Sequence, residues 1–309
     1  MSVQPAYIEL YSGWATAQNG GFLYGRVHRG EPQALPMPGE GLTKKLERTF
    51  KDLDLRALAN AGVRLSGFPG AGDVTADGNG FLKVSLPDGL PATTLSVTAN
   101  LDMPDYEAPS AVTRLPVTGA TEPLVGVISD IDDTLTDTGV THTEELLKHT
   151  LFNDTYDVKF FPDAPQTIAA IAGIGGELLP TLPVFYLSGS PWGLYQRISD
   201  AFDRCGLPHG AMILRRYSQE SLNPFDFKLP HLLEIVDANP GRRWILFGDT
   251  GEKDPEVYNT LIEKRPGSVD RVFIHKVTRE DPQDKRFEGF FVFVDWAEVG
   301  EALRTRPVR

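Results

Sequence analysis

The sequence predicts an α/β fold in which a doubly wound parallel sheet follows a β-sandwich-like domain. Within residues 1–117, short apolar runs alternate with turns rich in Gly, Asn and Asp, a pattern typical of small β sandwiches. Within residues 124–309, apolar runs of strand length alternate with stretches of helical periodicity, which indicates a parallel sheet with helices on both faces. We therefore expect two domains, 1–117 and 124–309, with a boundary near Thr118 to Pro123.

The first domain should consist mainly of short strands. The expected strands are Tyr7–Tyr11, Phe22–Val27, Val63–Leu65, Phe81–Leu86 and Thr93–Ala99. The turn Asp77-Gly78-Asn79-Gly80 leads into Phe81, and its residues tolerate the left-handed backbone of tight turns. Apolar residues recur at helical spacing from Leu42 to Leu53, so a helix is expected to interrupt the strands there.

The second domain should alternate strands and helices. The expected elements are the strand Val125–Ile128, the helices Thr143–Phe152 and Pro165–Ile174, the strand Val184–Leu187, the helices Leu194–Arg204 and Leu229–Val236, and the strands Trp244–Phe247 and Arg271–Ile274. Such alternation places the carboxyl ends of the strands side by side at one edge of the sheet.

Composition limits the function classes that are compatible with the chain. The net charge of −12 argues against a nucleic-acid partner, which would require a basic face. Cys205 is the only cysteine, so no intrachain disulfide can form, which fits a reducing compartment. We find no segment apolar enough to span a bilayer and no secretory leader, so we expect a cytoplasmic protein, free or peripheral to a membrane.

Two carboxylates after the first strand of the second domain are the most informative feature. Asp130-Ile131-Asp132-Asp133-Thr134 follows Val125–Ile128, and at strand period Asp130 and Asp132 point the same way. They lie at the sheet edge where α/β enzymes keep their chemistry. One ionised carboxylate can attack phosphorus, while its neighbour protonates the leaving oxygen and later deprotonates a water.

Two further groups fit a phosphoryl site. The strand Val184–Leu187 runs into Ser188-Gly189-Ser190-Pro191-Trp192, whose hydroxyls and amides can hold a phosphoryl oxygen. The alternative is a plain turn with Ser190 as the helix N-cap and Pro191 in the first turn. Lys228, just before Leu229–Val236, can neutralise charge shared by phosphate and carboxylates, and the alternative is a solvated surface lysine.

A second acidic pair follows the strand Trp244–Phe247. Asp249 and Asp254 bracket a loop and offer the hard oxygen ligands that Mg²⁺ prefers. The alternative is a Gly/Asp turn in which Asp254-Pro255 caps the next helix. Because all these groups fall at or near the carboxyl ends of strands, we expect them to converge on one phosphoryl-transfer site.

In this order the residues resemble the haloacid dehalogenase superfamily of aspartate-nucleophile phosphatases, whose sheet is Rossmann-like. The matching residues are Asp130, Asp132 and Thr134 for its first motif, Ser188 for its second, Lys228 for its third, and Gly248-Asp249 with Asp254 for its fourth. The resemblance implies that Asp130 forms the aspartyl-phosphate and that Asp132 is the general acid and base. It also implies a Mg²⁺ site formed by Asp130, the backbone carbonyl of Asp132, and Asp249, with Asp254 in support.

A narrower resemblance is carried by residues 128–134, 188–192 and 248–255. These segments are similar to the actin-patch-associated phosphatidate phosphatase family, which includes bacterial members with a β-rich domain ahead of the catalytic one. The resemblance implies a phospholipid substrate at a membrane surface, namely phosphatidate, which would be hydrolysed to diacylglycerol. We expect Thr134, Gly189, Ser190 and Arg215 to contact substrate, although the stretch around Arg215 matches the family only loosely and Thr250 replaces an expected serine.

The spacing of the motifs leaves room for a small cap domain or none. About fifty residues separate Thr134 from Ser188 and about forty separate Ser188 from Lys228, and the core needs helices from both stretches. An open site suits a phosphate on something large, such as a lipid or a protein side chain.

Two alternative functions remain open at this point. One is a phosphatase of phosphoproteins or soluble phosphate esters. The other is a non-catalytic phosphate-sensing or scaffold protein whose N-terminal domain recruits a protein partner. A sensor has no need of a proton donor such as Asp132 beside a nucleophile such as Asp130.

Overall fold

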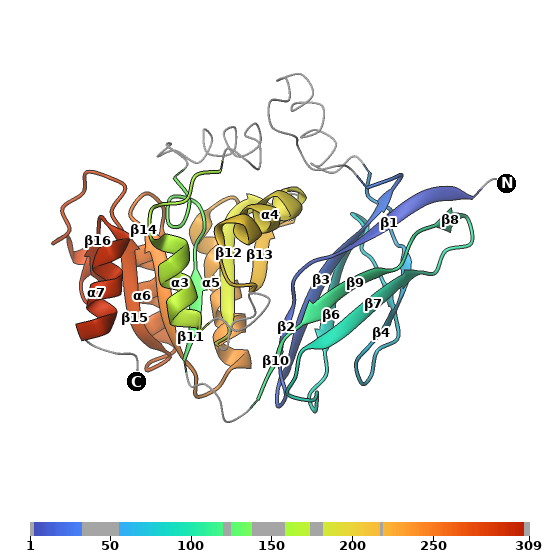
Figure 1. The fold of residues 1–309 in the computed structure, drawn as a ribbon, viewed down its shortest axis with the longest axis horizontal. Coiled ribbons are helices and arrows are strands. Elements are labelled where there is room, and N and C mark those ends of the chain that lie inside the picture. Colours follow the sequence, from blue (N-terminus) through green and yellow to red (C-terminus); the bar gives the residue numbers. More distant parts are fainter. Residues whose placement is uncertain are drawn as a thin grey trace, which may run out of the picture. The chain divides into compact units, whose positions relative to one another are not determined.

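The computed structural model describes residues 3–32, 56–119, 125–137, 158–173, 182–216 and 219–305. These residues fall into two compact units, 3–119 and 125–305 (Figure 1). The helices expected at 42–53 and 143–152 lie outside the described residues, and so does much of the stretch that the cap prediction concerns. Within the described ranges, the structure contains no helix that is long and apolar enough to cross a membrane.

The first unit is built from two β-sheets. Its strands are β1 (Gln4–Leu10), β2 (Trp14–Thr16), β3 (Gly20–Arg29), β4 (Gly62–Ser66), β5 (Asp73–Thr75), β6 (Phe81–Leu86), β7 (Leu95–Leu101), β8 (Tyr106–Glu107), β9 (Ala111–Leu115) and β10 (Val117–Thr118). One sheet has the order β10-β2-β3-β1-β8, with β6 also paired to β3, and the other has the order β5-β4-β7-β9. The strand β6 occupies the predicted residues, whereas β7 begins two residues later than predicted.

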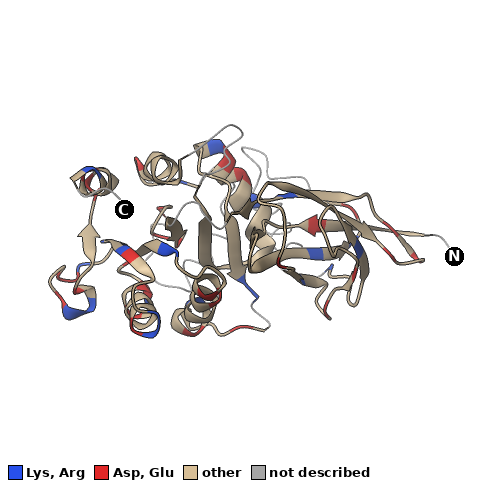
Figure 2. Cartoon of the chain, turned by 90° about the horizontal axis from the view of Figure 1, so that it is seen from below, with Lys and Arg blue, Asp and Glu red and all other residues tan. Residues whose placement is uncertain are grey.

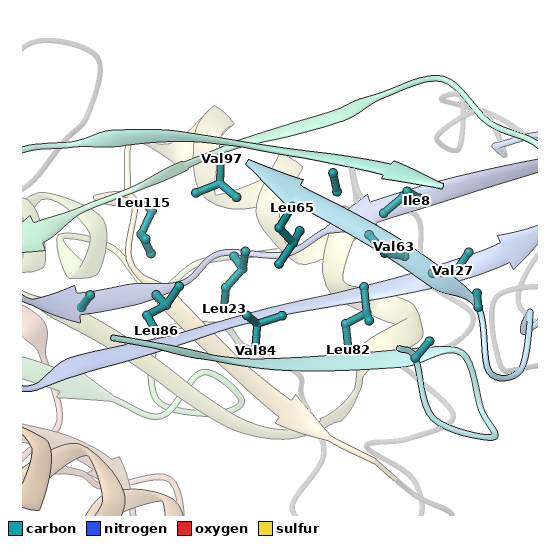
Figure 3. Packing of buried hydrophobic residues seen from close by; sticks show 14 of the residues in the cluster. Ile8, Leu23, Val27, Val63, Leu65, Leu82, Val84, Leu86, Val97 and Leu115 are labelled. Carbon is teal, nitrogen blue, oxygen red and sulfur yellow. The ribbon is translucent and has the colours of Figure 1, made fainter. Parts of the chain in front are cut away.

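Apolar side chains from the two sheets of this unit meet in one core. Leu23 of β3 and Leu82 of β6 pack in the same buried cluster as Val63 of β4 and Val97 of β7 (Figure 3). Along β6, buried apolar residues alternate with exposed polar ones, as expected for a strand with one face on the core. Two sheets that share one buried core in this way form a sandwich-like arrangement.

The second unit contains a parallel sheet. Its elements are β11 (Val125–Ser129), α3 (Ala164–Ala172), β12 (Val184–Pro191), η3 (Trp192–Leu194), α4 (Tyr195–Cys205), β13 (Ala211–Arg215), α5 (Pro224–Ala238), β14 (Arg243–Asp249), α6 (Asp254–Lys264), β15 (Val269–His275), η4 (Lys285–Phe287), β16 (Phe291–Phe293) and α7 (Trp296–Thr305). The strand order is β13-β12-β11-β14-β15-β16, and every pairing in it is parallel. The direction of strand progression reverses between β11 and β14, where ligands of open α/β sheets bind.

Helices cover both faces of this sheet. In Figures 1 and 2, α3, α4 and α7 lie on one face, and α5 and α6 on the other. Every residue of β11 is buried, as expected for a central strand between two helical layers. A side chain at Gly126 would meet the ring of Trp244 at 2.4 Å, so glycine lets this tryptophan of β14 pack directly on β11. The mixed α/β class with a parallel sheet is thereby confirmed.

Two elements differ from the prediction in ways that matter for the site. β12 does not end at Leu187 but continues to Pro191, with a register shift against β13 between these residues. The helix α5 begins at Pro224 rather than Leu229, because Asn223 caps it by accepting a hydrogen bond from the Phe225 N–H at 3.1 Å. Lys228 therefore lies inside a helix. The sequence patterns also missed β13, β16 and α7.

Candidate active site

The Asp130 carboxylate stands at the carboxyl end of β11, over the reversal point of the sheet. Its backbone N–H donates to the carbonyl of Phe247 in β14 at 2.9 Å, which fixes its position relative to both strands. The hydroxyl of Thr134 donates to Asp130 Oδ2 at 3.0 Å. Asp130 is 2% exposed and Asp132 8% exposed, so both carboxylates are largely shielded from bulk water.

The loop after β11 is held by side chains from the C-terminal part of the unit. Asp133 has a φ of 55°, a left-handed conformation that Asp adopts more readily than most residues. The Nδ1 atom of His275 lies 2.8 Å from the Asp133 carbonyl oxygen, and Trp296 Nε1 donates to the Thr134 carbonyl at 3.2 Å. Two consecutive carbonyls beside Asp132 are thus oriented by buried rings from β15 and α7.

The two serines after Leu187 converge on Asp132. Ser188 Oγ donates to Asp132 Oδ2 at 2.7 Å, and Ser190 Oγ donates to the same oxygen at 3.0 Å. The Ser190 N–H donates to Ser188 Oγ at 2.9 Å, which closes a small network. The residue at the N-cap of the following η3 is Pro191, without a side-chain cap, so the alternative of Ser190 as an N-cap is wrong.

Lys228 is a buried lysine at the centre of the acidic groups, not a surface lysine. Its side chain is 1% exposed, and Nζ donates to Asp130 Oδ1 at 2.8 Å and to Asp254 Oδ1 at 2.6 Å. A third carboxylate, Glu252, places Oε2 at 3.0 Å from the same nitrogen. An ammonium group is stable in such a buried place only with carboxylates as close partners.

Asp249 and Asp254 are joined to each other and to the rest of the site. The Asp249 N–H donates to Asp254 Oδ2 at 3.2 Å, while Asp249 Oδ1 accepts from the backbone of Gly251 and Glu252. A side chain at Gly248 would meet Asp254 Oδ2 at 2.5 Å, so only glycine lets this carboxylate approach the strand end. The alternative, in which Asp254 only caps the next helix, is not observed, because Lys253 occupies the N-cap position of α6.

The same carboxylates have the composition of a divalent-cation site. Ligand atoms of Asp130, Asp249 and Asp254 lie within 4.8 Å of one another, a bound slightly wider than the maximum separation of about 4.2 Å between Mg²⁺ ligands at about 2.1 Å from the ion. Asp249 Oδ2 is buried and has no hydrogen-bond partner among the described residues. A buried carboxylate oxygen without a donor fits a metal ligand, so the residues present suit the predicted Mg²⁺.

Burial and like charge raise the pKa of the acids in this site. Burial raises the pKa of Asp130 well above its usual range, and Lys228 opposes the shift only in part. Burial likewise raises the pKa of Asp249, with Asp254 adding to the effect. Burial raises the pKa of Asp132, although the hydroxyls of Ser188 and Ser190 oppose it. Burial alone would lower the pKa of Lys228, but the three carboxylates around it outweigh burial and raise it.

Arg215 lies beside the serine turn but is tied into the protein. It is 2% exposed, its Nη1 donates to the Leu222 carbonyl at 3.1 Å, and its Cζ lies 4.8 Å from the ring centre of Phe227. A side chain at Gly189 would lie 3.1 Å from the guanidinium. Arg215 therefore lies close to Gly189 of the serine turn while it is bound to Leu222, and its predicted contact with substrate stays a prediction.

Thr250 has a structural role that the sequence did not suggest. Its hydroxyl accepts from the N–H groups of Val277 and Thr278 at 3.0 Å each, and hydrogen-bonds the Thr278 hydroxyl at 2.9 Å. A serine hydroxyl at this position could make the same bonds, so the departure from the family pattern retains the interaction.

Sequence reasoning missed three residues that support the site, Glu252, His275 and Arg286. Arg286 donates from Nη2 to the Glu252 carbonyl at 3.0 Å and lies 3.4 Å from the Thr250 carbonyl, so it braces the loop between Asp249 and Asp254. Glu252 was visible between the two predicted metal ligands. Its contact with Lys228, however, depends on the loop conformation, and Arg286 comes from a separate element 34 residues further on.

Comparisons with known proteins match this chain to one described family and to two fungal proteins. Residues 125–276, which include every predicted site residue, match the family described as "Phosphatidate phosphatase APP1, catalytic domain". The chain is 24% identical over 208 residues to phosphatidate phosphatase APP1 of Saccharomyces cerevisiae, covering 65% of this chain and 34% of that protein. It is 26% identical over 162 residues to an uncharacterised protein of Schizosaccharomyces pombe, covering 50% of this chain and 25% of that protein.

The chain thus spans about a third or less of the length of these relatives. Among solved structures, a carbohydrate acetylesterase from Xanthomonas citri is 10% identical, covers 85% of this chain and 66% of its own, and has a TM-score of 0.27. A similarity of that size supports no conclusion about the fold. The family match and the yeast relative support the phosphatidate phosphatase APP1 family for residues 125–276 of this chain.

Proposed function

We propose that this chain is a cytoplasmic, Mg²⁺-dependent phosphomonoester hydrolase that works through an aspartyl-phosphate on Asp130 and acts on phosphatidate at a membrane surface. The observation that carries the proposal is the convergence of Asp130, Asp132, Lys228 and Asp249 at the carboxyl ends of β11 and β14. The strand order, with its reversal beside Asp130, supports a haloacid dehalogenase-like, Rossmann-type arrangement. The family match supports the lipid substrate.

In the first step, a carboxylate oxygen of Asp130 attacks phosphorus and the bond from phosphorus to the ester oxygen breaks. Asp132 donates its proton to that leaving oxygen, and diacylglycerol departs. The raised pKa of Asp132 favours the protonated acid that this step requires. Because both serine hydroxyls donate to Oδ2 of Asp132, the proton is available on the other oxygen.

In the second step, Asp132 as a carboxylate removes a proton from water while the water oxygen attacks phosphorus. The bond between phosphorus and Asp130 breaks, which releases inorganic phosphate and restores both side chains. Thr134 and Lys228 hold the Asp130 carboxylate in one orientation through both steps. The Lys228 ammonium also stabilises negative charge on the transferring phosphoryl group.

Mg²⁺ would supply further neutralisation of the phosphoryl oxygens. Asp130, Asp249 and the carbonyl of Asp132 would hold it. Both oxygens of Asp254 already accept hydrogen bonds, from Lys228 and from the Asp249 N–H, so Asp254 is better suited to orienting these groups than to direct coordination.

Release of inorganic phosphate tests the proposal directly. We expect phosphatidate in mixed micelles to be hydrolysed faster than soluble sugar or nucleotide monophosphates, and turnover to require MgCl₂ and stop with EDTA. Asp130→Asn should lower turnover by at least about 1,000-fold because the amide is a poor nucleophile. The matched control is Asp226→Asn, an exposed aspartate on α5, and it should retain activity.

Several results would count against parts of the proposal. If soluble esters or phosphoproteins are hydrolysed rapidly while phosphatidate is not hydrolysed, the phosphatase mechanism stands but the lipid substrate is excluded. Appreciable hydrolysis by Asp130→Asn would exclude the covalent route. The absence of phosphate release from every ester would favour the phosphate-sensing alternative.

A further inference from the structure

Glu252 occupies a position at the Lys228 ammonium that none of the predicted roles explains. The Lys228 Nζ hydrogen-bonds two carboxylates, Asp130 and Asp254, and an ammonium group has three N–H donors. Glu252 Oε2 lies 3.0 Å from the same nitrogen, yet it has no hydrogen bond among the described residues. The third donor of Lys228 is therefore approached by Glu252 but not fully engaged.

The three carboxylates around Lys228 differ in how firmly they are held. Asp130 receives a second hydrogen bond from Thr134, and Asp254 receives one from the Asp249 N–H. Glu252 is held through its backbone, whose N–H donates to Asp249 Oδ1 at 3.0 Å and whose carbonyl accepts from Arg286. Its side chain is 18% exposed, against 2% and 0% for Asp130 and Asp254. The Glu252 carboxylate is thus the most exposed of the three, and its Oε2 is held by no hydrogen bond among the described residues.

Charge makes this carboxylate a competitor of an incoming phosphate. Three carboxylates, those of Asp130, Glu252 and Asp254, lie within 3.0 Å of one ammonium, and those of Asp132 and Asp249 also interact with it electrostatically. The Glu252 charge also contributes to the raised pKa values of Asp130 and Asp249. A phosphate dianion that approaches Lys228 meets a like charge at the same nitrogen, which disfavours binding unless the glutamate moves away.

We propose that Glu252 is a displaceable counter-ion that occupies the phosphate position at Lys228 and must swing out before a phosphoryl group can bind. This inference rests on the proposed function, because it assigns Lys228 to phosphate binding. Glu252 is then a specificity determinant: it weakens the binding of all anions, so that only a group that contacts Lys228 and the rest of the site together displaces it. No bond is made or broken in this exchange.

Binding of inorganic phosphate to the full-length protein, measured by titration calorimetry in MgCl₂, tests the proposal. Glu252→Gln keeps the size of the side chain and removes its charge, and we expect about tenfold tighter phosphate binding. Glu252→Ala removes the competing oxygens as well and should tighten binding at least as much. The matched control is Glu263→Gln, which makes the same charge change at an exposed position of α6 and should alter the affinity less than twofold.

A steady-state experiment with p-nitrophenyl phosphate gives a second readout, in which KM should fall for Glu252→Gln by a similar factor. Unchanged or weaker phosphate binding by both Glu252 variants, with normal thermal unfolding, would overturn the proposal and make Glu252 a support for Lys228. Tighter phosphate binding in a protein that hydrolyses no phosphate ester would preserve the inference and refute the phosphatase function. The two failures are therefore distinguishable.

Discussion

Replacing Lys228 by methionine should destabilise the second unit strongly, because it leaves two buried carboxylates without their counter-ion. Asp130 and Asp254 are 2% and 0% exposed, and each accepts a hydrogen bond from the Lys228 ammonium. Removing one partner from a buried ion pair costs about 3–5 kcal/mol. For a unit of this size that loss corresponds to a fall in Tm of roughly 6–20 °C. Methionine has a similar shape, so lost packing contributes little.

The loss of unfolding free energy caused by Lys228→Met should be larger at high pH than at low pH. Burial raises the pKa of Asp130 and Asp254, so the folded chain retains these protons at pH values where the unfolded chain has released them. The unfolding free energy therefore falls as pH rises above the ordinary aspartate pKa. The raised pKa of Lys228 means that its own contribution is fully present below its unfolded value and is lost only as pH rises through its folded value. Because Lys228 lowers the pKa of Asp130 and Asp254, its removal raises both further and makes the unfolding free energy fall more steeply with pH, so Lys228→Met should lose less stability at pH 5.5 than at pH 8.

Urea unfolding at pH 5.5 and pH 8, followed by tryptophan fluorescence, measures both quantities. Lys264→Met, at an exposed position in the last turn of α6, is the control and should change the unfolding free energy by less than about 0.5 kcal/mol. The reasoning is refuted if Lys228→Met costs less than about 1 kcal/mol at pH 8. An equal loss at both pH values would show that the orphaned carboxylates are not its cause.

Three further predictions concern the reaction, the metal and the loop after β11. Asp132→Asn should slow the hydrolysis of esters with poor leaving groups by about 100-fold to 10,000-fold, and it should slow the hydrolysis of activated esters less. Equal losses of rate across a series of leaving groups would exclude Asp132 as the general acid. MgCl₂ should raise Tm more at pH 8 than at pH 5.5, because the raised pKa values of the metal-site carboxylates leave fewer of them ionised at low pH. Asp249→Ala should abolish most of this Mg²⁺-dependent increase in Tm. Persistence of that increase in Asp249→Ala would remove Asp249 from the metal site. His275→Phe should lower turnover by about 10-fold to 100-fold, because the Asp133 carbonyl loses the imidazole nitrogen that orients it. Circular dichroism should show an intact fold. A wild-type rate would contradict a role of His275 in orienting this carbonyl.

The sequence by itself determined the mixed α/β class and which polar residues stand near the ends of the parallel strands. The alternation along β6 and the apolar run of β11 follow from strand period and burial, which are local properties. Asp130, Asp132 and Asp249 were identifiable because each lies at or shortly after the end of a strand whose apolar pattern is clear. The boundaries of β12 and α5 could not be predicted from the sequence. A register shift in the sheet and the Asn223 cap determine them, and hydrophobic periodicity shows neither.

Only the tertiary structure decided which alternatives apply to the isolated polar residues. In the sequence, Lys228 is compatible with either a surface lysine or a lysine of the site. Only the packing of α5 places it against Asp130, which lies 98 residues earlier in the chain. Ser190 is a credible helix cap in sequence, but its hydroxyl reaches Asp132 across 58 residues. Contacts at such separation depend on how elements pack on the sheet, and no local pattern encodes them. For that reason Glu252, His275 and Arg286 emerged only from the folded arrangement, where buried charges and carbonyls must find partners.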